Sequence, residues 1–255
     1  MEVLAAVDLI AAEDTRHSRP LIRHLGIETP MLAMHEHNER QLVDKLTSRL
    51  RAGESLALIS DAGTPLISDP GFPLVRECHR QGIQVCPIPG PSAAICALSA
   101  AGLPTDRFRF EGFPARTPSA RREQLEGLCG ETATLVFYES SHRITACLAD
   151  MAQVFEPKRP AVLARELTKL HETIISATLG ALCDKLALEP LQRKGEFVIL
   201  VAGREKQPQL AAETERILRL LAAELPLKQA ALLASRITGE KKNRLYQLAL
   251  AWQRG

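Results

Sequence analysis

The stretch from Leu56 to Gly71, with the sequence LALISDAGTPLISDPG, constrains the fold of this chain more than any other part. Its apolar run, 56–59, is typical of a strand buried in a parallel sheet. A loop rich in small residues follows at once, and such loops let backbone amides approach a ligand. Ligands of open α/β sheets bind beyond the carboxyl ends of the strands. The stretch alone fits two interpretations: a ligand loop in which Asp61 binds a ribose or an amine, or a tight turn capped by Asp61.

A second loop of the same kind favours the ligand site. We predict a strand at 85–88, which the sequence Pro-Gly-Pro breaks, and a helix over 93–101 that Ser92 caps and Gly102 ends. A helix N-terminus beside a Gly-Pro turn suits a carboxylate or another polar ligand. Two glycine- and proline-rich loops after neighbouring strands indicate one shared site.

Composition and charge limit the classes of protein to which this chain can belong. The formal net charge of +2 is too small to indicate a nucleic-acid partner, so any RNA contact must come from local patches. The six cysteines contain no CxxC pair and are expected to be reduced core thiols. The spacing of His35 and His37 does not favour a metal site. With no apolar stretch long enough for a bilayer and no signal peptide, we expect a cytoplasmic protein.

Alternating strands and helices predict an α/β fold with three domains. We expect α/β domains at 1–88 and 89–204 and a helical domain at 208–255, after a linker at Gln207 and Pro208. The expected helices are 18–25, 39–50, 73–81, one after Ser140 or Ser141, 213–225, 227–235 and 245–252; the expected strands are 8–12, 108–113, 134–138, 161–164 and 197–201. The last two helices resemble a helix-turn-helix, and a plain helical hairpin is the competing interpretation.

Charged clusters follow two of the predicted strands. Asp14 and Arg16 come after the first strand, where they could bind a polar substrate or form a helix cap with solvated charges. Glu139, His142 and Arg143 follow another strand, and their position at a strand end favours a functional role. Basic residues gather at two further places, and solvated surface is the alternative for both: a predicted loop with Arg116, Arg121 and Arg122, and a predicted turn with Lys241, Lys242 and Arg244.

Blocks of sequence in order along the chain resemble one family. They are AAEDTRH, DAGTPLISDPG, PGPSAAICALSAAGLPTDRF, FYESSHR, ARELTKLHE and KGEFVILV. The chain resembles the ribosomal small-subunit methyltransferase I family, in the tetrapyrrole-methylase-like group of S-adenosylmethionine (SAM) enzymes. The resemblance implies two α/β domains with SAM in the cleft between them, and a homodimer. It also implies methylation of a ribose 2′-hydroxyl, on a cytidine of the decoding centre in 16S rRNA.

The resemblance also implies roles for individual residues. The expected SAM contacts are Asp61, Gly63, Thr64, Ser92, Ala93 and Leu167. The expected substrate-side and catalytic residues are Asp14, Arg16, Glu139, His142 and Arg143. Which of these, if any, accepts the proton stays open.

One departure from the family leaves alternatives open. The family's sheet opens one strand earlier, with a turn like TPIGNL that this sequence lacks. We expect that the sequence begins at an internal Met of a longer reading frame, the alternative being a domain without its first strand. Two rival functions remain: a methyltransferase acting on a tetrapyrrole or another small molecule, and an RNA-binding chain with impaired catalysis.

Overall fold

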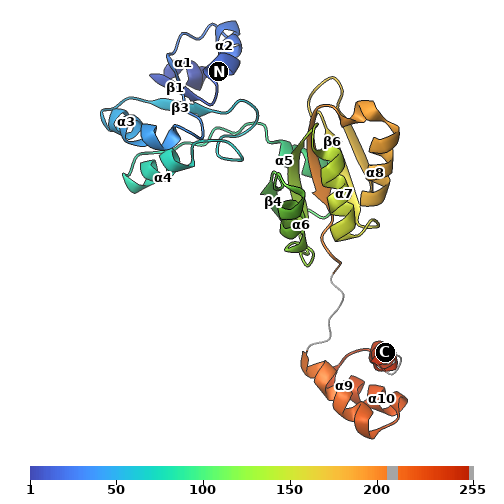
Figure 1. Cartoon of the computed structure of the whole chain (residues 1–255). Helices are drawn as coiled ribbons and strands as arrows, with labels where there is room; N and C mark the ends of the chain where they lie inside the picture. Colours follow the sequence, from blue (N-terminus) through green and yellow to red (C-terminus); the bar gives the residue numbers. More distant parts are fainter. Residues whose placement is uncertain (206–211, 253–255) are drawn as a thin grey trace. The chain divides into compact units, whose positions relative to one another are not determined.

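The chain forms two compact units, Met1–Arg204 and Glu205–Gly255 (Figure 1). The computed structural model describes residues 1–205 and 212–252. The first unit contains two separate sheets flanked by helices, so the predicted α/β class is confirmed. The boundary expected between residues 88 and 89 stays a prediction, and the linker residues Gln207 and Pro208 lie outside the described residues. None of the helices in the described ranges is long and apolar enough to cross a membrane.

The first sheet is parallel and has the strand order β2-β1-β3. Its strands are β1 (Leu9–Ala12), β2 (Met31–Ala33) and β3 (Leu56–Ile59). Alternate side chains of β1 face opposite layers, as the pleat requires: Ile10 packs with Ile22 on one side, and Leu9 packs with Leu46 and Leu74 on the other. The helices are α1 (Glu2–Ala6) and α2 (Thr15–His24) on the first side, and α3 (Glu39–Arg51) and α4 (Phe72–Arg80) on the second (Figure 1).

The strand predicted at 85–88 is wrong. No strand is assigned to these residues, and the side chains of Val85 and Ile88 are exposed. A strand exists only when a neighbouring strand accepts its backbone hydrogen bonds. Within the described ranges β3 pairs with β1 alone. Apolar sequence is therefore not sufficient here, because no described strand pairs with 85–88.

The second sheet is mixed, with the order β4-β5-β8-β6-β7. Its strands are β4 (Phe108–Gly112), β5 (Thr134–Ser140), β6 (Pro160–Arg165), β7 (Thr173–Thr178) and β8 (Glu196–Val201). Helix α5 (Ala93–Ala101) packs its alanines on Val136, Val162 and Leu200. The other face is covered by α6 (Pro118–Glu126), α7 (Ile144–Phe155) and α8 (Leu179–Leu188), and a short 3-10 helix, η1 (Pro190–Arg193), follows α8.

Two parts of this region differ from the sequence-based expectation. The predicted loop at 114–122 is instead largely helical, because Pro118 opens α6 and Leu125 is buried in the core. Strand β7 is absent from the predicted elements; it is an uncharged edge strand with alternating exposure. The helix expected after Ser140 or Ser141 is α7, and it buries Ile144, Cys147 and Met151.

The second unit is helical in its described part. Helices α9 (Ala212–Glu224), α10 (Leu227–Thr238) and α11 (Lys242–Trp252) pack around Leu218, Ala231, Ala234 and Leu245. Gly239 ends α10 with a left-handed backbone conformation (φ 77°), the common conformation after a helix C-terminus. The expected pair of helices around a tight turn is confirmed.

Candidate active site

A hollow of about 520 Å³ opens at the carboxyl ends of the parallel strands in the first sheet. The register aligns Ala12 of β1 with Ile59 of β3, so the residues that follow both strands meet. The backbone amide of Asp14 donates a hydrogen bond to Oδ1 of Asp61 over 3.2 Å. The lining residues are Glu13, Asp14, Thr15, Arg16, Ala33, His35 and Asp61. The structure thus brings together a predicted SAM residue, Asp61, and two predicted substrate residues, Asp14 and Arg16.

Asp14 and Arg16 form a helix cap and a charged pair at once. Oδ1 of Asp14 accepts the amide of Arg16 over 2.8 Å, which caps α2, and Oδ2 accepts from the Arg16 guanidinium over 2.7 Å. The hydrogen bonds from the Arg16 side chain and amide hold the pKa of Asp14 well below its usual range. The Arg16 side chain is 89% exposed, so its guanidinium remains accessible to a ligand. The cap is confirmed, and the substrate role stays a prediction.

The two glycine-rich loops are joined by a hydrogen bond. The Thr64 hydroxyl donates to the backbone carbonyl of Pro91 over 2.8 Å. Gly63 has a φ of 116°, a conformation that L side chains rarely adopt. Ser92 and Ala93 stand at the start of α5, and the next amide, that of Ala94, donates to the Tyr138 hydroxyl over 3.2 Å.

One detail of the second loop corrects the prediction. Ser92 occupies the capping position of α5, but its hydroxyl makes no capping hydrogen bond. Because first-turn amides have no partner inside a helix, the start of α5 retains donors for a polar group. Leu167 lies after β6 and packs partly buried beside α5. The SAM roles of Gly63, Thr64, Ser92, Ala93 and Leu167 remain predictions.

Asp69 is a candidate that sequence reasoning missed. Burial raises its pKa to about 6; the nearby carboxylates of Glu13 and Asp61 add to this rise, and the Ser60 hydroxyl opposes it. Leu66 and Ser68, just before it, have positive φ values of 72° and 68°, which non-glycine residues rarely adopt. The available signal was the Asp-Pro-Gly segment at residues 69–71, which ends the opening stretch and resembles an ordinary turn.

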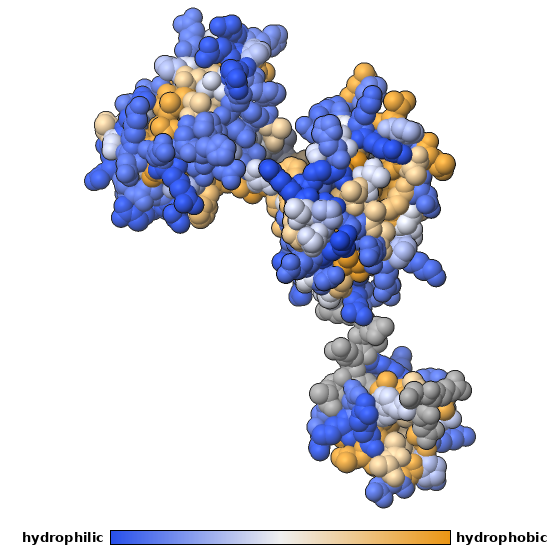
Figure 2. Space-filling model, in the orientation of Figure 1, coloured by the Kyte–Doolittle hydropathy of each residue, from blue (hydrophilic) through white to orange (hydrophobic). Residues whose placement is uncertain are grey.

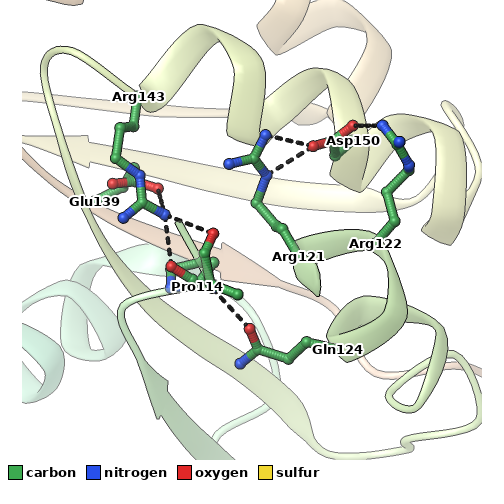
Figure 3. A network of polar contacts seen from close by, with 8 residues as sticks. Pro114, Arg121, Arg122, Gln124, Glu139, Arg143 and Asp150 are labelled. Atoms are coloured by element: carbon green, nitrogen blue, oxygen red, sulfur yellow. Dashed lines mark hydrogen bonds and ion pairs between the residues drawn. The ribbon is translucent and has the colours of Figure 1, made fainter. Parts of the chain in front are cut away.

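The buried Glu139 forms an ion pair with the partly buried Arg143 (Figure 3). The Glu139 side chain is fully buried, and Arg143 Nη2 lies 3.2 Å from its Oε2. The same nitrogen donates to the backbone carbonyls of Pro114 and Ala115 over 2.5 and 3.0 Å. The pair therefore anchors the loop between β4 and α6. Neither residue lines the hollow, and the nearby His142 is exposed, so their catalytic roles stay predictions.

Arg121 corrects the predicted basic loop. Its side chain is only 4% exposed, and its Nε donates to Oδ2 of Asp150 over 2.7 Å (Figure 3). A buried guanidinium held in this way is not presented to a phosphate. Arg122 bonds Oδ1 of the same Asp150 over 3.0 Å while staying half-exposed. Arg116 is exposed, and the RNA roles of Arg116 and Arg122 remain predictions.

The second unit carries the other predicted RNA residues. Lys241 is exposed, Lys242 begins α11, and Arg244 Nη1 lies 3.1 Å from Oε2 of Glu240. The pair with Glu240 offsets the charge that Arg244 offers to a phosphate. The RNA roles of these three residues stay predictions.

Comparisons with known proteins define the class. Residues 1–183 match the family of Tetrapyrrole (Corrin/Porphyrin) Methylases, and residues 208–253 match the RsmI C-terminal HTH domain. Among solved structures, diphthine synthase is similar with a TM-score of 0.58 at 15% identity, covering 79% of this chain and 82% of that one. Cobalt precorrin-4 methyltransferase is similar with a TM-score of 0.55 at 20% identity, covering 79% of this chain and 86% of that one.

Curated relatives are similar along almost the whole chain. The ribosomal RNA small subunit methyltransferase I of Pseudomonas aeruginosa is 56% identical over 99% of this chain and 91% of the relative. The protein of the same name from Escherichia coli O157:H7 is 52% identical over 99% and 89%. The chain belongs to the tetrapyrrole methylase family and, within it, to the ribosomal RNA small subunit methyltransferase I group. The prediction of a SAM-dependent methyltransferase is therefore confirmed.

We predict that Asp150→Ala destabilises the first unit by about 3–5 kcal/mol, because it leaves the buried Arg121 without its counter-ion. The measurement is urea unfolding followed by far-UV circular dichroism. Glu189→Ala is the control: it removes an exposed carboxylate 4.0 Å from Lys185, and its effect should stay below about 0.5 kcal/mol. Equal urea midpoints for Asp150→Ala and wild type would contradict a stabilising role of the Arg121–Asp150 pair. The RNA role first predicted for Arg121 would then be possible again.

We predict a pH signature for Asp69. Because its pKa is higher in the folded chain, the folded state binds the proton more tightly, and stability falls as pH rises from about 4 to about 6. Asp69→Asn removes this loss, so the stability of the variant relative to wild type should improve over that range, by on the order of 1 kcal/mol after solvent screening. Thermal melts at several pH values measure it, with Asp44→Asn on the surface of α3 as control. If the melting temperatures of Asp69→Asn and wild type change with pH in parallel, the raised pKa of Asp69 is contradicted.

Proposed function

We propose that this chain transfers the methyl group of SAM to the ribose 2′-hydroxyl of a cytidine in the decoding centre of 16S rRNA. The relatives' names support an rRNA of the small subunit as substrate. The cytidine and the 2′-hydroxyl rest on the resemblance of the sequence blocks. The structural observation that carries the proposal is the Asp14–Asp61 contact, which puts a predicted substrate residue beside a predicted SAM residue.

The residues present fit a cofactor with a ribose and an amino-acid end. Asp61 offers a carboxylate to hydroxyl or ammonium donors, and the start of α5 offers amide donors to a carboxylate. The Thr64–Pro91 hydrogen bond ties the two loops, so both would hold one ligand. When bound, SAM supplies a methyl group on a positively charged sulfur. The predicted location in a cleft between the two α/β domains is part of this proposal.

The chain's main contribution to the reaction is alignment. Holding the hydroxyl oxygen in line with the transferred carbon supplies much of the rate, because it replaces a random encounter by a fixed geometry. Arg16 is exposed at the rim and suits an RNA phosphate, which a guanidinium binds through paired hydrogen bonds. Asp14 is a poor proton acceptor because its pKa is lowered by Arg16. A carboxylate whose pKa is raised to about 6 is a better acceptor. Asp69 is the candidate: it does not line the hollow, but the carboxylates of Glu13 and Asp61, which do, are close enough to raise its pKa.

Two further parts of the proposal concern the oligomeric state and the cellular compartment. The family resemblance supports a homodimer, and the small ribosomal subunit as substrate supports action in the cytoplasm. Light scattering of the purified chain measures the first: a mass of one chain at micromolar concentration would contradict the homodimer.

The test of the function is methyl transfer to purified small ribosomal subunits that lack the modification, with isotopically labelled SAM. A 2′-O-methyl group blocks alkaline cleavage at its nucleotide, so the expected product is a labelled, cleavage-resistant cytidine. Label on a base would overturn the 2′-O assignment. Label on a tetrapyrrole in place of RNA would favour the small-molecule methyltransferase. RNA binding without any SAM binding in calorimetry would favour the non-catalytic alternative.

We predict that Asp61→Ala weakens SAM binding by about 1.5–3 kcal/mol, which is roughly a 10- to 150-fold rise in Kd, because a charge-assisted hydrogen bond is lost. Calorimetry with SAM measures the change. Asp44→Ala is the control, since it removes a carboxylate from the exposed surface of α3. An unchanged Kd in folded Asp61→Ala would remove Asp61 from the site.

A further inference from the structure

The outward face of α2 carries three arginines and no acidic residue to offset them within the helix. The helix has the sequence TRHSRPLIRH, with arginines at 16, 19 and 23, two histidines and no acidic residue. All three arginines are exposed, and with Pro20 they line a shallow hollow of about 290 Å³. Figure 2 shows hydrophilic side chains over this helix. We call Arg16, Arg19 and Arg23 the α2 arginine face.

These charges have no structural partner that explains them. In the described ranges no carboxylate lies within ion-pair distance of Arg19 or Arg23, and only Arg16 is paired, through Asp14. Some arginines on other surface helices are paired, as Arg80 of α4 is with Glu77 and Arg216 of α9 is with Glu213. Within the described ranges Arg51 of α3 has no ion-pair partner either, but it does not line the candidate active site. Like charges three and four residues apart destabilise a helix by a few tenths of a kcal/mol.

The helix dipole accounts for only part of this arrangement. Arg23 stands in the last turn, where a positive charge is favourable, but Arg19 stands nearer the positive end of the helix. Core packing does not require Arg19 either, because Ile22 and Ser18 form the buried side of α2. The face therefore has the character of a surface that binds an anion.

Its position indicates which anion. Arg16 lines both the hollow with Asp61 and the hollow on α2, so the face leads directly into the candidate active site. Arg16 and Arg23 are about 10 Å apart along the helix axis, since each residue adds about 1.5 Å. A row of guanidinium groups of this length suits successive phosphates of one nucleic-acid strand.

We propose that the α2 arginine face binds the phosphate backbone of the rRNA strand whose nucleotide enters the hollow at Asp61. This rests on the proposed function for the identity of the RNA. It adds a phosphate-binding surface on the first unit, separate from the helices of the second. A ribose hydroxyl is best reached in an unstacked strand, and a backbone held beside the hollow would fix its direction of entry.

The test compares Arg19→Gln/Arg23→Gln with wild type in binding to purified small ribosomal subunits at about 50–400 mM KCl. Each phosphate contact on a single strand contributes a slope of about −0.7 in a plot of log K against log salt, so the slope should become shallower by about 1.4. For salt plots that meet near 1 M, this slope difference corresponds to a loss of affinity of roughly 60-fold at 50 mM KCl and about four-fold at 400 mM. KM for the subunits should rise while kcat and the SAM Kd stay unchanged. Arg16 is kept, because it belongs to the candidate active site.

The matched control is Lys45→Gln/Arg51→Gln on α3. It removes the same charge from exposed residues of a helix on the opposite face of the first sheet. Its slope should equal that of wild type, and Arg19→Lys/Arg23→Lys should restore most of the lost slope.

Equal slopes and affinities for Arg19→Gln/Arg23→Gln and wild type would overturn the proposal. An equal loss in the α3 control would also overturn it, because the effect would then be one of net charge alone. A loss of binding to heparin but not to subunits would show a general anion site and reject the rRNA assignment. If wild type itself neither binds nor methylates subunits, the proposed function fails. Failure of the phosphate-binding proposal alone is distinguishable, because wild type would then bind and methylate subunits while the α2 variant behaved like wild type.

Discussion

The parallel pairing of β1 with β3 is the constraint on which the candidate active site depends. Its register places the residues after Ala12 and Ile59 at one edge of the sheet, where the amide of Asp14 reaches the carboxylate of Asp61. The flanking layers hold this register, because a slip by one residue would turn Ile10 and its neighbours toward the wrong layers. The chemistry proposed at this edge is therefore a consequence of core packing several residues away.

Charged residues after the strands have two different physical roles in this chain. Around Asp61 and Arg16 they remain accessible, whereas Glu139 is buried and its partner Arg143, which is partly buried, holds the backbone of Pro114. A buried pair of this kind is costly to desolvate and is maintained by its further hydrogen bonds. The pair fixes where the loop after β4 lies, and the catalytic role of Glu139 stays a prediction. Proximity to a strand end is thus a weaker criterion of function than accessibility.

Much of the fold was predictable because apolar periodicity reports burial directly. Helix α3, helix α7 and strand β8 were all expected near their observed positions. The strand at 85–88 and the missed β7 failed for one common reason, namely that strand formation depends on a partner that is distant in sequence. The raised pKa of Asp69 could not be predicted from the sequence for the same reason. It depends on burial and on the carboxylates of Glu13 and Asp61, which only the fold brings near Asp69.

The distribution of charge explains how a nearly neutral chain could act on a polyanion. A net charge of +2 produces little long-range attraction, and at physiological ionic strength fields are screened within about 8 Å. Binding must then depend on guanidinium groups that touch phosphates. Arg121 is excluded by its burial against Asp150, and Arg244 is partly offset by Glu240. The α2 arginine face lacks such offsets at Arg19 and Arg23 within the described ranges, and Arg16 connects it to the hollow that Asp61 lines. Local phosphate contacts would then both bind the RNA and position the strand at that hollow.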